Sequence, residues 1–124
     1  MARKTILIVE DDPYICSSLK EFFEENEYQV FVALNGLEAL NILKTSITPS
    51  LILLDLMMPV MDGFQFRENQ LADQNLKHIP VVVMSADGNL GEKNAKTTAH
   101  EYIKKPFDIF NLLTIVEKII LEPT

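Results

Sequence analysis

The feature that most constrains the fold is the alternation of short apolar runs with longer segments of helical periodicity. The apolar runs are TILIV (5–9), QVFVA (29–33), LILLD (51–55), VVVMS (81–85) and EYIKK (101–105). Three of them are almost continuously aliphatic, which is typical of parallel strands that are buried on both faces. The unbroken alternation predicts an α/β fold, in which helices cover both faces of a parallel five-stranded sheet through right-handed crossovers.

Helices are expected between and after these runs, and several should begin at recognisable capping residues. The expected starts are Pro13 after the N-cap Asp12, the residue after Asn35, a position near Gly63, a weaker helix around 89–97, and the residue after Asp108. The first helix should cover 13–25, because Ile15, Leu19 and Phe22 fall on one stripe of it.

The composition fits an ordinary globular domain. A chain of 124 residues can bury about two-thirds of the surface that it exposes when unfolded. The last helical segment runs close to Thr124, so we expect a single domain over residues 1–124 with no output domain. The formal charge of −7 argues against direct binding of nucleic acid, because that binding depends on Lys and Arg.

Location is predicted from what the sequence lacks. It begins with no signal peptide, and no apolar run approaches the roughly 20 residues of a membrane span, so we expect a cytoplasmic protein. A single cysteine cannot form a disulfide within the chain, which suits a reducing compartment. Cys16 is therefore expected to be a small, buried core residue.

Polar side chains stand at the ends of four of the five expected strands. Glu10 and Asp11 follow the first strand and Asp55 ends the third, while Ser85 and Lys105 end the fourth and fifth. Parallel α/β sheets bind ligands beyond the carboxyl ends of their strands. If the first and third strands are neighbours, their carboxylates converge and repel, and a divalent cation such as Mg²⁺ would offset the charge.

Each of these residues also has an ordinary structural explanation. Asp12 fits a helix cap better than a metal ligand. Asp55 could form a turn, Ser85 could be a strand-end hydroxyl, and Lys105 could be a solvated charge. A single polar residue at a strand end can arise by chance. Suitable polar residues at four strand ends of one sheet are much harder to ascribe to chance.

Four motifs, in order, resemble the response-regulator receiver domain of two-component signalling. They are ILIVEDD (6–12), LILLDLMMPVMDG (51–63), VVVMSA (81–86) and YIKKPF (102–107), and they span essentially the whole chain. The resemblance implies a flavodoxin-like (βα)5 three-layer sandwich with strand order 2-1-3-4-5. It also implies a phosphoacceptor signalling domain, which catalyses only its own phosphorylation and dephosphorylation.

The resemblance assigns a metal site and a phosphoacceptor. Asp55 would accept the phosphoryl group, and Asp11 and Asp55 would ligate Mg²⁺, with Mn²⁺ as an alternative ion. Glu10 would support the ion through a water molecule. The backbone carbonyl of Met57 would complete the protein ligands.

The resemblance also assigns the groups around the phosphoryl oxygens. Ser85 and Lys105 would receive these oxygens, and Tyr102 would be the aromatic switch that moves with Ser85. The bond between Lys105 and Pro106 is expected to be cis. The implied partner is a sensor histidine kinase or a histidine phosphotransfer protein.

Three residues depart from the usual pattern of the family without removing a functional group. Glu10 stands in place of aspartate, and Ser85 stands where threonine is commoner. Thr98 stands where the family often has glycine, so a positive φ there would strain a β-branched residue.

Three other functions share parts of the pattern. A haloacid-dehalogenase-type phosphatase would have a second aspartate two residues after Asp55, where this chain has Met57. A flavodoxin-type electron carrier would need its first loop to hold a phosphate, which Glu10 and Asp11 would repel. A receiver that only binds and is never phosphorylated is less favoured, because all the phosphorylation groups are present.

The last helix is apolar over most of its circumference. Only Asn111, Thr114, Glu117 and Lys118 interrupt the apolar residues between 109 and 121. One face suffices for packing on the sheet, so we expect some of Leu113, Val116 and Ile120 at the surface. Such a patch would bind a downstream protein or a second copy of the chain, together with the fourth helix and the fifth strand.

Overall fold

Strand formation follows the apolar runs to within one residue. The computed structural model describes residues 3–86 and 98–121. The strands are β1 (Lys4–Val9), β2 (Tyr28–Ala33), β3 (Leu51–Asp55), β4 (Val81–Ser85) and β5 (Glu101–Lys104). All neighbouring strands are parallel and the order is β2-β1-β3-β4-β5, which confirms the predicted fold and strand order.

The helices begin where capping chemistry predicts. They are α1 (Pro13–Glu25), α2 (Gly36–Leu43), α3 (Gly63–Leu71) and α5 (Ile109–Leu121). The Asp12 carboxylate accepts from the N–H of Tyr14 at 2.9 Å, and the Asn35 amide oxygen accepts from the N–H of Glu38 at the same distance. The helix expected around 89–97 lies outside the described residues.

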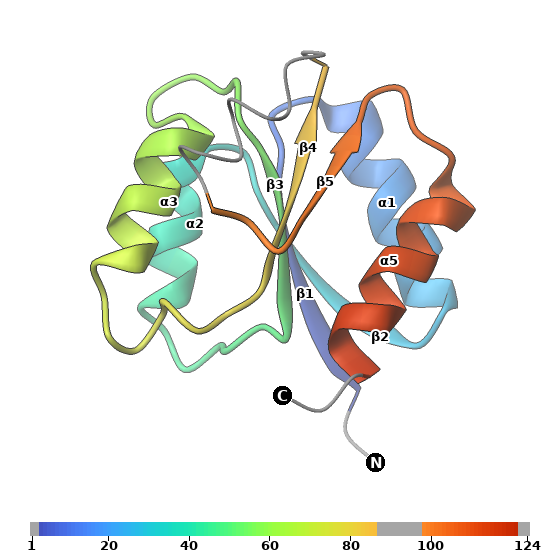
Figure 1. The fold of residues 1–124 in the computed structure, drawn as a ribbon, viewed down its shortest axis with the longest axis horizontal. Helices are drawn as coiled ribbons and strands as arrows, with labels where there is room; N and C mark the ends of the chain where they lie inside the picture. The colour runs from blue at the N-terminus through green and yellow to red at the C-terminus, as the bar shows by residue number, and fades with distance from the viewer. Residues whose placement is uncertain (1–2, 87–97, 122–124) are drawn as a thin grey trace.

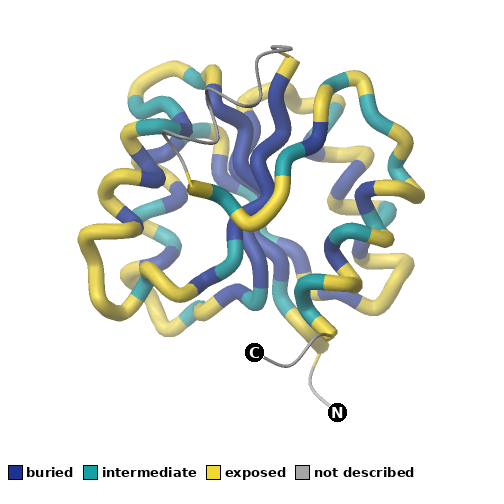
Figure 2. The backbone as a smooth tube through the Cα atoms, viewed as in Figure 1, coloured by how far each residue is buried: buried dark blue, intermediate teal, exposed yellow. Residues whose placement is uncertain are grey.

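The sheet separates two layers of helices (Figure 1). Helices α1 and α5 cover one face, and α2 and α3 cover the other. Side chains alternate across β1, so that Ile6 and Ile8 join the core under α1 and α5, while Leu7 and Val9 join the core under α2 and α3. The central strands are therefore buried on both sides (Figure 2).

The apolar surface of α5 differs from the prediction. Val116 is fully buried, because it shares the sheet-facing stripe of the helix with Leu112 one turn earlier. The expectation that Val116 could be exposed is therefore wrong. Leu113 and Ile120 are half-buried, and the most exposed apolar residues of α5 are Phe110 and Leu121, each 68% exposed.

Several smaller predictions can also be compared with the structure. Cys16 is buried, as expected. Met58 and Met61 pack against the core under α2 and α3, whereas the side chain of Met57 is 71% exposed. Thr98 stands where the family often has glycine, and its φ is 47°. The positive φ that would strain a β-branched residue is therefore present. Within the described ranges, no helix has the length and apolar character needed to cross a membrane.

Candidate functional site

The acidic residues meet where β1 and β3 end side by side. Val9 lies opposite Leu54 in the parallel register, so the residues that follow, Glu10 and Asp55, reach the same level of the sheet. Glu10 is 1% exposed and Asp55 is 6% exposed, whereas Asp11 lies at the surface. One carboxylate oxygen from each of these three residues lies within 4.8 Å of the others. The predicted convergence of carboxylates is therefore confirmed.

Lys105 brings a positive charge into this acidic pocket. Its Nζ donates to Glu10 Oε1 at 2.6 Å and lies 3.5 Å from Asp55 Oδ1. The backbone of Lys105 is held in turn, because its N–H donates to the carbonyl of Ser85 at 2.8 Å. The end of β4 thereby positions the lysine that follows β5.

Burial and neighbouring charges together shift the pKa values of Glu10 and Lys105. Burial raises the pKa of Glu10, and Asp55 acts in the same direction, so that together they outweigh the hydrogen bonds from Lys105 and Asp12. Burial acts to lower the pKa of Lys105, but the hydrogen bond to Glu10 and the charge of Asp55 raise it overall. The raised pKa of Lys105 reflects the negative charge of Glu10 and Asp55 around it.

The other residues assigned from the sequence lie around this pocket. Ser85 is buried at the end of β4, one position beyond Met84, which pairs with Asp55. Met57 follows β3 by two residues. Tyr102 is half-buried in β5, and its hydroxyl accepts from the N–H of Ala99 at 2.9 Å. The peptide bond between Lys105 and Pro106 is cis.

The three carboxylates suit a magnesium ion. Mg²⁺ prefers oxygen ligands, and ligands on opposite sides of it lie about 4.2 Å apart. The spread of the three carboxylate oxygens, within 4.8 Å, is close to this value. Glu10, Asp11 and Asp55 are therefore the residues that could hold the ion.

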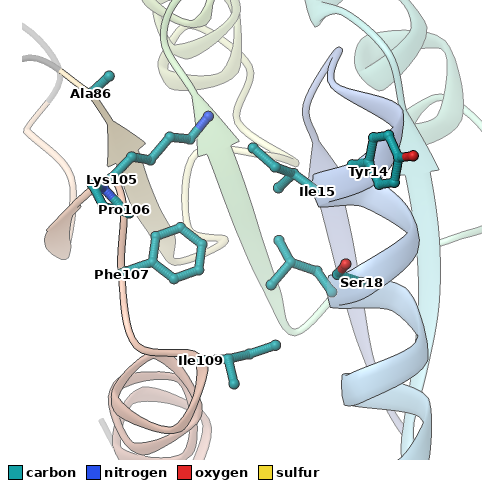
Figure 3. Close-up of a pocket in the computed structure, with 9 residues that line it drawn as sticks. Tyr14, Ile15, Ser18, Ala86, Lys105, Pro106, Phe107 and Ile109 are labelled. Carbon is teal, nitrogen blue, oxygen red and sulfur yellow. The ribbon is translucent and has the colours of Figure 1, made fainter.

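A separate, apolar cavity lies beside the acidic pocket (Figure 3). Its volume is about 460 Å³, and it opens between α1 and the connection from β5 to α5. The lining residues are Tyr14, Ile15, Ser18, Leu19, Ala86, Lys105, Pro106, Phe107 and Ile109. Lys105 belongs to both places, but the apolar lining of this cavity does not suit a phosphoryl group or a metal ion.

A buried polar pair in α3 was not predicted from the sequence. Arg67 and Gln70 are both buried, and Arg67 Nη1 donates to Gln70 Oε1 at 2.8 Å. Arg67 Nη2 also donates to the carbonyl of Thr98 at 3.0 Å. The signal for this pair was an Arg and a Gln three residues apart, on the face of α3 that also carries the buried Phe66.

Comparison with protein families places these residues in a known context. The response regulator receiver domain family matches the chain over residues 6–117. Sporulation initiation phosphotransferase F of Bacillus subtilis is 37% identical over 121 residues, which cover 95% of this chain and 94% of that protein. Response regulator Rre1 of Synechocystis is 32% identical over 119 residues, but this chain spans only 51% of its length. Several other curated relatives are likewise matched over about half of their length.

Solved structures have the same fold. The receiver domain of a signal transduction histidine kinase from Syntrophus aciditrophicus is 31% identical with a TM-score of 0.88, covering 98% of this chain and 94% of that one. The receiver domain of a sensor histidine kinase from Pseudomonas aeruginosa, solved with a magnesium ion in its active site cleft, also has a TM-score of 0.88. It covers 98% of this chain and 100% of that one, but at 24% identity it shows the fold alone.

Proposed function

Because this chain belongs to the response regulator receiver domain family, we propose that Asp55 accepts a phosphoryl group from a phosphohistidine, with Mg²⁺ held by the neighbouring carboxylates. The domain is a phosphoacceptor signalling module rather than an enzyme that acts on external substrates. One observation carries the proposal: the buried Asp55 carboxylate shares a pocket with Glu10, Asp11 and the ammonium of Lys105.

The chemistry requires positioning and charge neutralisation more than a strong base. A carboxylate is a weak nucleophile toward phosphorus, so the site must hold it in line with the bond that breaks. One oxygen of Asp55 would form a bond to phosphorus while the bond from phosphorus to the histidine nitrogen breaks. Bound Mg²⁺ would supply positive charge at the phosphoryl oxygens. Burial of Asp55 at a rigid strand end supports the required alignment.

Lys105 and Ser85 are the proposed partners of the phosphoryl oxygens. The Lys105 Nζ, 3.5 Å from Asp55, can reach an oxygen of a group bound to that carboxylate. The Ser85 hydroxyl comes from the neighbouring strand end and can donate a hydrogen bond. The carbonyl of Met57 and a water-mediated contact from Glu10 are proposed to complete the metal site.

The proposed response to phosphorylation involves Tyr102 and the surface of α5. Tyr102 would move with Ser85 between two arrangements of the sheet edge. A downstream protein or a second copy of the chain would bind the α5 face, where Phe110 and Leu121 are exposed. The proposed phosphodonor is a histidine kinase or a phosphotransfer protein, and the proposed location is the cytoplasm.

Phosphorylation with a small donor tests the assignment. Intact-protein mass spectrometry after incubation with acetyl phosphate should show one added phosphate when Mg²⁺ is present and none when EDTA replaces it. Asp55→Asn should abolish this labelling. Asp62→Asn is the matched control, because Asp62 caps α3 in the loop that follows Asp55 and asparagine also caps helices well. Equal labelling of Asp55→Asn and the wild type would refute the proposal.

A further inference from the structure

The peptide group between Thr98 and Ala99 bridges α3 and β5. Its carbonyl, that of Thr98, accepts from Arg67 Nη2 at 3.0 Å. Its N–H, that of Ala99, donates to the Tyr102 hydroxyl at 2.9 Å. The peptide is therefore held from one side by a guanidinium of α3 and from the other by a phenol of β5. Figure 1 shows that the chain leading into β5 begins beside α3.

The guanidinium is itself firmly anchored. Arg67 is 3% exposed, and its Nη1 donates to Gln70 Oε1 at 2.8 Å. The Gln70 amide nitrogen donates to the carbonyls of Leu76 and Ile79, each at 3.0 Å. Arg67 thus holds the peptide from a position fixed by α3 and by the connection from α3 to β4.

Packing alone does not explain an arginine at this position. Burial of a charged side chain is costly, whereas an apolar residue would fill the same space without that cost. Burial lowers the pKa of Arg67, and the nearby Tyr102 acts in the opposite direction. The peptide that Arg67 holds follows Thr98, whose φ of 47° is unfavourable for a β-branched residue and persists only where the surroundings enforce it.

We propose that Arg67 is a positioning residue for Tyr102, acting through the peptide group between Thr98 and Ala99. By fixing this peptide it sets where the Tyr102 ring lies, and so the balance between the two arrangements that phosphorylation of Asp55 selects. The effect on the balance between the two arrangements rests on the proposed function. The positioning of Tyr102 by Arg67 does not depend on it.

The test compares Arg67→Met with Glu68→Met. Both variants place methionine in α3, but Glu68 lies at the surface and serves as the matched control. In the metal-free protein, NMR should show a displaced Tyr102 ring signal and at least tenfold faster hydrogen exchange of the Ala99 amide in Arg67→Met alone. Beryllofluoride with Mg²⁺ imitates a phosphoryl group on Asp55. Its apparent affinity for Arg67→Met should differ at least threefold from its affinity for the wild type. In a Tyr102→Phe background, Arg67→Met should have no further effect on that affinity.

Each outcome decides one part of the inference. Identical Tyr102 and Ala99 signals in Arg67→Met and Glu68→Met would overturn it and leave the proposed function intact. Displaced signals with unchanged beryllofluoride affinity would overturn the link to phosphorylation. Failure of the wild type to bind beryllofluoride would count against the proposed function, while the Tyr102 signal would still decide the role of Arg67.

A second variant covers the case in which Arg67→Met does not fold. Tyr102→Phe removes the acceptor on the other side of the peptide, so the Ala99 amide should exchange faster. The side-chain N–H signals of Arg67 should shift in the same variant, because the guanidinium binds the other side of that peptide. Unchanged Arg67 signals would overturn the inference.

Discussion

At the scale of single residues, Val60 has a backbone conformation that its own side chain disfavours. Its φ is 68°, and the N–H of Met61 donates to the carbonyl of Pro59 at 2.8 Å across it, which forms a tight three-residue turn. The side chain is 76% exposed, so packing contributes little in return. This turn directs Met61 to its place against Gly36, whose N–H donates to the Met61 carbonyl.

Val60→Asn should therefore stabilise the protein. Asparagine tolerates a positive φ far better than a β-branched residue, so we expect the free energy of unfolding to rise by about 0.5–1 kcal/mol. Urea denaturation measures the change. Val60→Thr keeps the β-branch and should give no gain, and a similar gain in both variants would show that relief of backbone strain is not the cause.

His100 should make the stability depend on pH. Partial burial of its ring lowers the pKa, and the charge of Arg67 acts in the same direction, while the ring Nδ1 accepts from the N–H of Val81 at 3.4 Å. As the pH falls below about 6.5, the unfolded chain binds a proton before the folded one does, so stability decreases.

His100→Asn tests this effect, because it removes the titrating group and keeps a side-chain acceptor. Between pH 7 and pH 5, the free energy of unfolding should fall less in His100→Asn than in the wild type. His78→Asn is the control, since His78 is also a surface histidine and takes no part in the contact between His100 and Val81. Equal slopes in His100→Asn and the wild type would contradict the prediction.

Residues whose role depends on local sequence were predictable, and those that depend on tertiary contacts were not. Asp12 and Asn35 cap the helices that follow them, and the strand-end carboxylates follow from where the apolar runs stop. The spacing of Arg67 and Gln70 is a local signal for their pairing, but the contact of Arg67 with Thr98 has none, because Thr98 is 31 positions away. The burial of a charged side chain there depends on contacts that form only in the folded chain.

At the scale of elements, the start of α3 lies unusually close to the end of β3. A Cβ added to Gly63 would come within 2.4 Å of the Asp55 carbonyl oxygen and 2.7 Å of Leu56 Cα. These are backbone atoms, which cannot move aside as a flexible side chain can. No described glycine has a positive φ, so Gly63 is required here for close approach rather than for backbone freedom.

Gly63→Ala should destabilise the protein and disturb the phosphoacceptor. Alanine favours a helix by up to about 1 kcal/mol over glycine, but overpacking costs about 1–3 kcal/mol, so we expect a net loss. Urea denaturation measures this loss, and the rate of labelling by acetyl phosphate should fall with it. Asn69→Ala, on the exposed part of α3, is the control and should do neither. If Gly63→Ala kept the wild-type free energy of unfolding and labelling rate, β3 and α3 could move apart without loss of stability, and the prediction would be wrong.

Element types were easier to predict than the faces that elements expose. Strand and helix starts depend on apolar runs and caps, which the sequence displays directly. The burial of Val116 depends on which stripe of α5 meets the sheet, and an almost uniformly apolar helix does not reveal this.

At the scale of the whole molecule, alternation alone predicted a parallel sheet but left the strand order open. The order came from resemblance to receiver domains, and it decides the function, because it places the carboxyl end of β1 beside that of β3. Any order that separated these two strands would have left Glu10 and Asp11 far from Asp55. The site is therefore a property of the topology as much as of its residues.

This topology gathers negative charge in a chain that already carries a formal charge of −7. Mg²⁺ should therefore stabilise the whole fold, by about 1.4 kcal/mol at ten times its dissociation constant. Asp11→Asn should remove most of this gain and should raise the melting temperature of the metal-free protein, because one of three converging charges is gone. Thermal unfolding with Mg²⁺ and with EDTA measures both effects. Asp12→Asn is the matched control, since it keeps an N-cap for α1 and leaves the three carboxylates intact. If Asp11→Asn kept the full stabilisation by Mg²⁺, Asp11 would not be a ligand, and Asp55 would be the carboxylate that holds the ion in the acidic pocket.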